Sequence, residues 1–241
     1  MMRTHPYDKL LGRKRKWSPV KPTVGVLKNG AEDTIRRALA ARHLELPVGA
    51  FIKEGLEKDV PDNARRLLED NVKDEIRHDK ALQYIVNAHG ADEKAEKEAK
   101  RIRDAWISHP DHTIVKALVA ERAIFFVLLP FFRFSGDSGT RTVSADISRD
   151  EQIHVATNSL VCRELGLSPS QSLDKLRKAT INWILQPLGT NTKDKYLDKN
   201  FWLDASDRLM YEGKAPEFSD TQRARMPAFF EHSNVNLPQY A

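Results

Sequence analysis

The sequence predicts an all-α protein built around a single hydrophobic core. Apolar residues recur at helical spacing in several segments, and no long stretch alternates apolar and polar residues as a half-buried strand would. A chain of 241 residues, 40% of them hydrophobic, can bury one sizeable core or at most two small ones. No fixed-period repeat or linker divides the sequence. We therefore expect an N-terminal arm over 1–30, one helical domain over 31–215 and a C-terminal tail over 216–241.

Breaker residues divide the domain into consecutive helical segments. They fall at about residues 31–58, 63–88, 92–103, 118–134, 141–165, 169–186 and 196–211. Pro47 is expected to disturb the first segment, and Asp62 is the expected N-cap of the second, which Gly90 stops. The third is nearly all Lys, Glu, Ala and Arg with charges alternating in sign, which favours a solvent-facing helix over disorder.

The later segments have equally clear boundaries. The sequence His-Pro-Asp at 109–111 breaks the third segment, and the very apolar fourth leads into a glycine turn at 135–139. Gly166 closes the fifth segment. Ser168 and Pro169 then provide an N-cap and a first-turn proline for the sixth.

Composition excludes several classes of protein. The single cysteine, Cys162, excludes a disulfide-stapled fold and a thiolate metal site, so any metal must be held by carboxylates and histidines. It also favours a reducing, cytoplasmic compartment. The longest apolar run, Ala123 to Phe132, has ten residues and contains Pro130, whereas a membrane span needs about 20. The segment Met1 to Lys9 has no signal-peptide core, and we expect no membrane partner.

The net charge of +5 comes largely from a basic cluster near the N-terminus. Its members are Lys9, Arg13, Lys14, Arg15 and Lys16. Such a cluster can bind nucleic acid or a membrane surface, or it can be a solvated segment without a partner. The chain has no zinc-finger spacing, no Gly-rich phosphate loop and no interleaving of Arg with aromatic residues. These absences favour the solvated segment, and nucleic acid is not an expected partner.

Two predicted helices carry the pattern Glu-x-x-His, at Glu75 to His78 and at Glu151 to His154. Residues three apart lie on one helical face, so each pair can offer a carboxylate and an imidazole to the same metal ion. A four-helix di-metal site needs two such pairs and one further Glu from each of the other two helices. Such pairs also arise by chance, so the prediction of a di-metal site depends on whether two further glutamates stand at suitable positions.

Two further glutamates stand at matching positions. Glu121 lies 30 residues before Glu151, and their midpoint falls in the predicted glycine turn. Glu45 lies 30 residues before Glu75, again with the midpoint in a predicted turn. Because residues equidistant from the turn of an antiparallel hairpin lie opposite each other, both hairpins predict a carboxylate facing a Glu-x-x-His pair.

Glu121 is embedded in an apolar segment, 117–129. Burying an ionised Glu costs several kcal/mol, so a cation or a hydrogen-bonding network is required there. The alternative is a buried salt bridge with Arg122 or with an arginine of another helix. Glu45 has two rival carboxylates on its own segment, Glu54 and Glu57. His43, His89, His109 and His112 have no carboxylate three residues before them and are expected at the surface or in helix caps.

The segment Ile147 to His154 has the form I-x-R-D-E-x-x-H. Together with Glu121 followed four residues later by Phe125, and with Trp17-Ser18-Pro19 upstream, it resembles the ferritin-like di-metal carboxylate proteins. Within them it resembles the small, radical-generating subunit of class I ribonucleotide reductase. The segment Phe229 to Tyr240 resembles that family's exit into its C-terminal tail. The resemblance implies a ferritin-like four-helix bundle with additional helices.

The resemblance also implies a site that holds two metal ions, Fe/Fe or Mn/Fe. The implied ligands are Glu45, Glu75, His78, Glu121, Glu151 and His154. Phe125 and Ile147 would line an apolar pocket beside the metals. Trp17, Asp150 and His78 would relay an oxidising equivalent. Tyr240 would pass it to the large subunit, which reduces ribonucleotides to deoxyribonucleotides for DNA replication.

These relay and lining residues also have purely structural interpretations. Trp17 can be a packing residue, and Phe125 and Ile147 would be core residues in any helical bundle. Asp150 can be the ion-pair partner of Arg149 or Arg77.

The sequence departs from the common form of the family at Leu82. In the usual form of the family, the residue four positions after the corresponding histidine is the tyrosine that holds the stable radical. Tyr84 is two positions further along and points to a different helical face, so we do not expect it to replace that tyrosine. Tyrosine-less members store the oxidising equivalent on a manganese/iron pair and tend to have Glu as their first ligand, as Glu45 would be here.

Three functions remain open at this stage. The first is the small subunit of a class I ribonucleotide reductase, expected as a homodimer. One residue follows Tyr240, without an acidic docking extension, which counts against a large-subunit partner. The second is a stand-alone di-metal oxidase or hydroxylase, with room near Leu82, Phe125 and Ile147 for a small organic substrate. The third is a metal-free binding module on the same fold.

Overall fold

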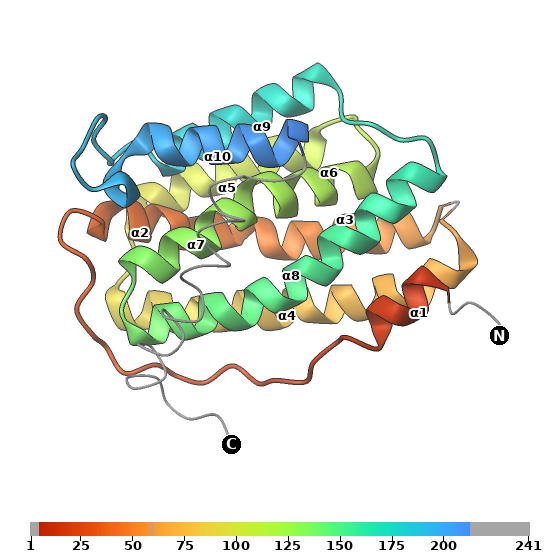
Figure 1. Ribbon diagram of the computed structural model, residues 1–241, viewed down its shortest axis with the longest axis horizontal. Coiled ribbons are helices and arrows are strands. Elements are labelled where there is room, and N and C mark those ends of the chain that lie inside the picture. Colours follow the sequence, from red (N-terminus) through yellow and green to blue (C-terminus); the bar gives the residue numbers. More distant parts are fainter. Residues whose placement is uncertain (1–4, 59, 213–241) are drawn as a thin grey trace.

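The computed structural model describes residues 5–58 and 60–212, and Figure 1 shows their arrangement. Within these residues every regular element is a helix, apart from an isolated pairing of Gly189 with Asp198. The predicted all-α fold is therefore confirmed. No helix in this part of the chain is long and apolar enough to cross a membrane. The expected tail, 216–241, lies outside the described residues.

The α-helices are α1 (Pro6–Leu11), α2 (Glu32–Ala40), α3 (Glu45–Leu56), α4 (Asp62–His89), α5 (Glu93–Ser108), α6 (Thr113–Ala120), α7 (Phe126–Ser135), α8 (Ser138–Glu164), α9 (Gln171–Ile184) and α10 (Lys199–Glu212). The short elements are two 3₁₀ turns, η1 (Ala41–Leu44) and η3 (Lys195–Leu197), and one π-helical turn, η2 (Glu121–Phe125). The segment α6, η2 and α7 is one continuous rod.

Four helical rods form the bundle: α3, α4, the α6–η2–α7 rod and α8. Short connections, residues 57–61 and 136–137, join them as two antiparallel hairpins. The rod α3 packs against α4 and α6, and α8 packs against α4 and α7 (Figure 1). Each rod turns an apolar face inward, and most of the buried hydrophobic residues form one continuous core.

The outer helices α5, α9 and α10 cover the bundle and are held by large buried side chains. Trp106 of α5 is fully buried and donates a hydrogen bond from Nε1 to Thr180 Oγ1 of α9 at 3.0 Å. Trp202 of α10 packs edge-on against Phe131 of α7, with ring centroids 5.5 Å apart. Burial of such a side chain contributes about 1.5–3 kcal/mol, enough to keep the outer helices against the rods.

Two glycines of α3 allow it to pack closely against the neighbouring helices α4 and α6. A Cβ added to Gly55 would lie 2.5 Å from Ile114 Cδ1 of α6. One added to Gly49 would lie 3.2 Å from Glu75 Cβ of α4. A side chain at Gly55 would require Ile114 to move, and one at Gly49 would crowd Glu75, so the two glycines allow α3, the helix that carries Glu45, to pack closely against α6 and α4.

The first segment is disturbed near Pro47, as predicted: the 3₁₀ turn η1 directly precedes α3, and Pro47 in the first turn of α3 has no N–H to donate to the carbonyl of His43. Two predicted N-caps differ from the structure. Pro61 is the N-cap of α4, and Asp62 lies inside its first turn. Ser170 rather than Ser168 caps α9, accepting a hydrogen bond from Leu173 N.

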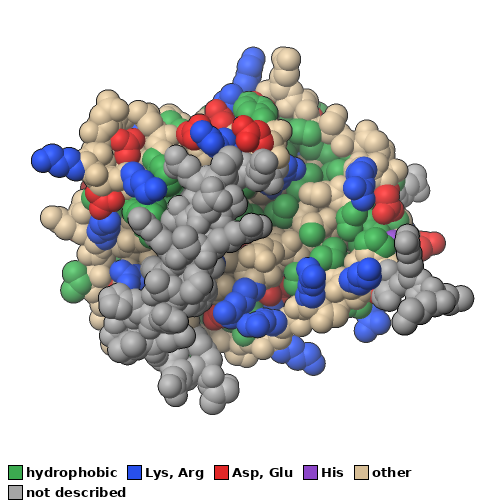
Figure 2. Space-filling model, in the orientation of Figure 1, with side chains coloured by type: hydrophobic (Ala, Val, Ile, Leu, Met, Phe, Trp, Pro, Cys, Tyr) green, Lys and Arg blue, Asp and Glu red, His purple; other side chains and the backbone are tan. Residues whose placement is uncertain are grey.

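The segment between α1 and α2, residues 12–31, forms an extended arm along one side of the molecule (Figure 1). Backbone N–H groups hold its far end, with Gly25 donating to Asp137 Oδ2 at 2.8 Å and Lys28 to the Ser135 carbonyl at 2.8 Å. Of its basic cluster, Arg13, Arg15 and Lys16 are exposed. Figure 2 shows Lys and Arg side chains spread over the face it views, among fewer Asp and Glu.

Candidate metal centre

The bundle core contains four glutamates, one from each rod. Glu45 is the first residue of α3 and Glu121 the first residue of η2, while Glu75 and Glu151 lie in the middle of α4 and α8. All four have no exposed surface, and neither have His78 and His154, one turn further along α4 and α8. The structure therefore brings together the six residues expected as ligands.

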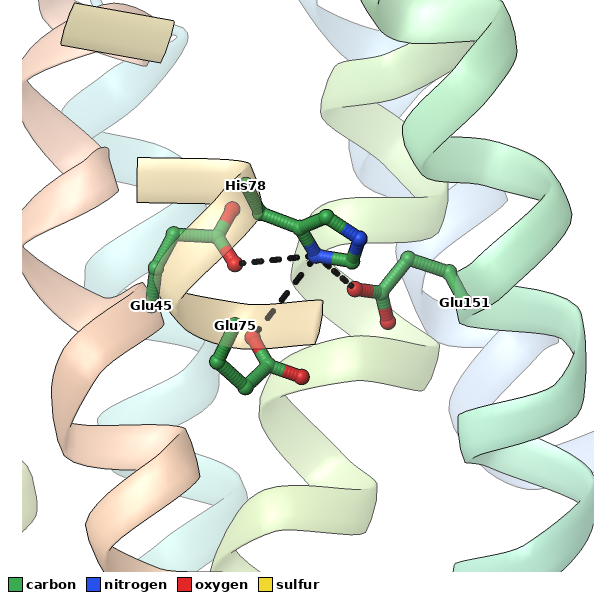
Figure 3. Close-up of side chains that lie close together, drawn as sticks. All are labelled: Glu45, Glu75, His78 and Glu151. Atoms are coloured by element: carbon green, nitrogen blue, oxygen red, sulfur yellow. Dashed lines mark ion pairs between the residues drawn. The ribbon is translucent and has the colours of Figure 1, made fainter. Parts of the chain in front are cut away.

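Three carboxylates converge on His78 (Figure 3). Its Nδ1 atom lies 3.1 Å from Glu151 Oε1, 3.7 Å from Glu45 Oε2 and 3.8 Å from Glu75 Oε2. One ligand atom from each of these four residues falls within 4.8 Å of all the others, a spacing that suits one metal ion.

A second set surrounds His154. Its Nδ1 atom lies 2.8 Å from Glu75 Oε1 and 3.6 Å from both Glu121 Oε1 and Glu151 Oε1. Glu75, Glu121 and His154 also form a group of ligand atoms within 4.8 Å of one another. Glu75 contacts one histidine with each of its oxygens, and Glu151 Oε1 approaches both, so two carboxylates connect the two sets.

The hydrogen-bonding state of these atoms tests whether a metal fits. Both oxygens of Glu45, Glu75 and Glu151, Oε1 of Glu121 and Nδ1 of both histidines are buried without a well-aligned hydrogen bond within the described residues. Buried polar atoms left in this state destabilise a protein unless another partner satisfies them. Two divalent cations would balance four ionised glutamates and coordinate all these atoms. The residues therefore fit two metal ions.

The pKa values of these side chains in the metal-free protein also fit a cation-binding site. Burial raises the pKa of Glu45, Glu75 and Glu121 above the ordinary value, and the charge of Glu151 raises those of all three further. Burial alone would lower the pKa of His78, but its carboxylate neighbours, Asp150 first, outweigh it and raise that pKa well above the usual value. In the absence of a cation, protons therefore take its place.

Each histidine is also held from outside by an aspartate of the opposite helix. His78 Nε2 of α4 lies 3.2 Å from Asp150 Oδ2 of α8, and His154 Nε2 of α8 lies 3.0 Å from Asp74 Oδ2 of α4. A carboxylate on Nε2 keeps the proton there and leaves Nδ1 facing the cluster. Sequence reasoning missed Asp74. The signal was present, because Asp-Glu-x-x-His occurs at both 74–78 and 150–154.

The three expected relay residues are in contact. Trp17 Nε1 of the arm donates to Asp150 Oδ2 at 2.8 Å, and the same oxygen contacts His78. Arg77 also donates to Asp150 at 2.8 Å, so the structural interpretation of Asp150 as an ion-pair partner of Arg77 holds at the same time. Burial would raise the pKa of Asp150, but these partners outweigh it and hold the pKa below its usual value.

Lys14 reaches the other half of the centre. Its ammonium contacts Asp74 and lies 3.5 Å from His154 Nε2. Its side chain is 8% exposed. The sequence placed Lys14 in a solvated basic cluster, and this placement is wrong because the arm turns this one side chain inward.

Glu121 has a neutral partner instead of the salt bridge considered above. Asn158 of α8 donates from Nδ2 to Glu121 Oε2 at 2.7 Å, while Arg122 Nε donates to the Leu209 carbonyl at 2.7 Å. Asn158 was not foreseen, because its spacing from His154 has no meaning until the helices are paired. The π-helical turn at Glu121 is a feature that often accompanies functional sites.

The remaining expected residues fall in two groups. Leu82, Phe125 and Ile147 are buried in the apolar core, at 4%, 3% and 0% exposure. Tyr240 lies outside the described residues. The rival carboxylate Glu54 pairs with Lys58 at the surface, whereas Glu45 lies in the cluster.

Comparison with known proteins supports the fold. No family model matches the chain, and no curated protein matches its sequence. A crystal structure from Bacillus halodurans, described as that of a "putative class I ribonucleotide reductase", aligns with a TM-score of 0.60 and 13% sequence identity. The alignment covers 89% of this chain and 93% of that chain. The fold is therefore a ferritin-like four-helix bundle with additional helices, of the ribonucleotide reductase small-subunit kind.

Proposed function

We propose that this chain is the small subunit of a class I ribonucleotide reductase. In this proposal, Glu45, Glu75, His78, Glu121, Glu151 and His154 hold two metal ions. The observation that carries it is the pair of buried ligand sets joined by Glu75 and Glu151, with hydrogen-bonded contacts from His78 outward to Trp17. The chain is similar in fold to a protein described in the same terms.

The donor set favours iron and manganese. Carboxylate and imidazole ligands without a thiolate suit these ions, so we propose an Fe/Fe or a Mn/Fe centre. When bound and exposed to O2, such a pair supplies an oxidising equivalent. Leu82 stands where the usual family form has its radical tyrosine, which favours the Mn/Fe alternative.

The surrounding residues would orient and shield the centre. Asp150 and Asp74 keep Nδ1 of each histidine facing inward. Buried Phe125 and Ile147 would keep water away from the ions. Trp17 borders a surface cavity of about 630 Å³, so the path from His78 through Asp150 reaches the outside of the protein, where a large subunit would accept the oxidising equivalent.

Metal analysis tests the centre. The chain, purified without chelator and loaded aerobically with Fe(II), Mn(II) or both, should contain two ions and should lack the electron paramagnetic resonance signals of isolated Fe(III) and Mn(II), because the two ions are magnetically coupled. Elemental analysis that finds zinc alone, or no metal, would contradict the proposal and favour the metal-free binding module.

Reconstitution tests the role of the subunit. With a class I large subunit, the loaded protein should reduce ribonucleotides, and Trp17→Phe should abolish this activity while the metal content stays at that of the wild type. Unchanged turnover in Trp17→Phe would show that the relay is wrong. Light scattering would check the homodimer that the proposal includes.

The second candidate function is a stand-alone di-metal oxidase or hydroxylase. The observation that favours it is Leu82, an apolar side chain buried one turn beyond His78, at a position that could face a small organic substrate. It requires O2 consumption without a large subunit, and an activity that Trp17→Phe leaves unchanged.

A further inference from the structure

The two halves of the centre match in their inner carboxylates but differ in what contacts their outer aspartates. Arg77 donates to both Asp74 and Asp150. The third contact differs: the neutral indole of Trp17 donates to Asp150, whereas the ammonium of Lys14 contacts Asp74. Both residues belong to the same stretch of the arm, three positions apart.

Lys14 is held inside the protein, unlike the rest of its basic cluster. Its side chain is 8% exposed and that of Asp74 5%, whereas Arg13, Arg15 and Lys16 are exposed. A lysine normally extends its ammonium into water, and burying the charge is unfavourable unless a counter-charge compensates. The short arm segment from 14 to 17 thus places a positive charge at one histidine and an uncharged group at the other.

Charge balance shows the effect of this difference. The outer network has two aspartates against Arg77 and Lys14 and is neutral. The inner cluster has four glutamates and becomes neutral with two divalent cations. The positive charge of Lys14, however, lies only on the His154 side, 3.5 Å from His154 Nε2. A cation on that side is repelled by Lys14, while a cation beside His78 faces the neutral Trp17.

We propose that Lys14 makes the two cation positions unequal, so that the position at His78 fills before the position at His154. This inference rests on the proposed di-metal function. Lys14 repels a cation at either position, but the nearer one more. At the effective dielectric constant of a partly buried site, this difference in repulsion lowers the affinity of the His154 position relative to the His78 position on the order of tenfold. Glu75 and Glu151 serve both positions, so Lys14 is the difference in net charge between the two halves.

The experiment is an anaerobic Mn(II) titration of the full chain, followed by the electron paramagnetic resonance signal of free Mn(II). The wild type should bind two ions in two steps of different affinity. In Lys14→Met the weaker step should tighten by about tenfold, toward the stronger one. Lys14→Arg, which keeps the charge, should retain the unequal steps. Lys16→Met, an exposed change in the same arm, is the matched control and should match the wild type.

Two further variants test the order of filling without changing Lys14. Glu121→Gln removes a ligand of the His154 position alone, so it should weaken the weaker step far more than the tight step, which should persist. Glu45→Gln removes a ligand of the His78 position alone and should abolish the tight step. If Lys14→Met does not fold, these variants still test the order of filling, and a tight step at the His154 position overturns the inference.

The outcomes separate this inference from the proposed function. A wild type that binds neither Mn(II) nor, in a parallel anaerobic titration, Fe(II) overturns the proposed function. Two ions bound with equal affinity overturn the role of Lys14 and leave the di-metal centre intact. Unequal steps that persist in Lys14→Met, or a tight step lost in Glu121→Gln instead of Glu45→Gln, also overturn the inference.

Discussion

The helical rods and the N-terminal arm contribute to the same centre in different ways. The rods bring the six proposed ligand residues together by helical periodicity, each on a buried face supported by the whole core. The arm has no helix between α1 and α2 and reaches the centre through two side chains, Lys14 and Trp17. The comparison shows that the rods determine what the centre can hold, while the arm determines how its two halves differ.

The largest effect is expected from a ligand that both halves share. Glu75→Gln removes the carboxylate that contacts His78 and His154, so we expect the metal content to fall from two ions per chain to below one. Glu69→Gln, an exposed change on the same helix, should keep both ions. Elemental analysis after loading measures this, and full occupancy of Glu75→Gln would disprove the assignment of the rods as the metal-binding part.

The next effect is a dependence of stability on pH in the metal-free protein. The pKa values of Glu45, Glu75 and Glu121 are higher in the folded protein than the ordinary glutamate value of 4.5. The three groups therefore contribute stability that is fully present below pH 4.5 and is lost as the pH rises through their folded-state pKa values. Bound cations replace the protons. Calorimetry should show a difference in Tm between the loaded and metal-free protein that widens from pH 5.5 to pH 8. A constant difference would mean that these carboxylates do not bind the metal.

A smaller effect is expected where the arm meets a rod. A Cβ on Gly139 of α8 would lie 2.3 Å from the Cβ of Pro22, whose ring cannot rotate away. Gly139→Ala should therefore displace the arm and weaken nearby contacts, including that of Gly25 with Asp137, at a cost of about 1–2 kcal/mol in unfolding free energy. Denaturant unfolding measures the loss, and metal content should stay at two ions. Loss of the metals would show that the arm is needed to assemble the rods.

The smallest effect concerns thiol reactivity. Burial raises the pKa of Cys162 on α8 to about 12, so its thiol should react with iodoacetamide at neutral pH far more slowly than a free thiol. A cysteine introduced into the arm, Lys16→Cys, should react readily. Similar rates at the two positions would mean that the rod opens as easily as the arm.

Much of the fold and of the ligand set follows from local patterns in the sequence. Helical spacing and breaker residues predict the rods, and the shared separation of 30 residues pairs Glu45 with Glu75 and Glu121 with Glu151, because a hairpin converts sequence distance into spatial opposition. These four side chains do meet in the structure, whatever they bind.

The contacts that sequence reasoning missed depend on tertiary structure. Lys14 looks like any member of a basic cluster until the arm is seen to lie along α4 and α8. Asn158 acquires a partner only when η2 and α8 pack together.

The crossed aspartates have a consequence for how α4 and α8 can move. Asp74 and His78 lie on one helix, Asp150 and His154 on the other, and each aspartate contacts the histidine across from it. Sliding one helix past the other by a single turn, about 5.4 Å, would separate both pairs at once. The register of the two helices is therefore fixed by both pairs, and a one-residue insertion within either Asp-Glu-x-x-His segment, which rotates later positions by about 100°, would prevent the two Asp–His pairs from forming at the same time.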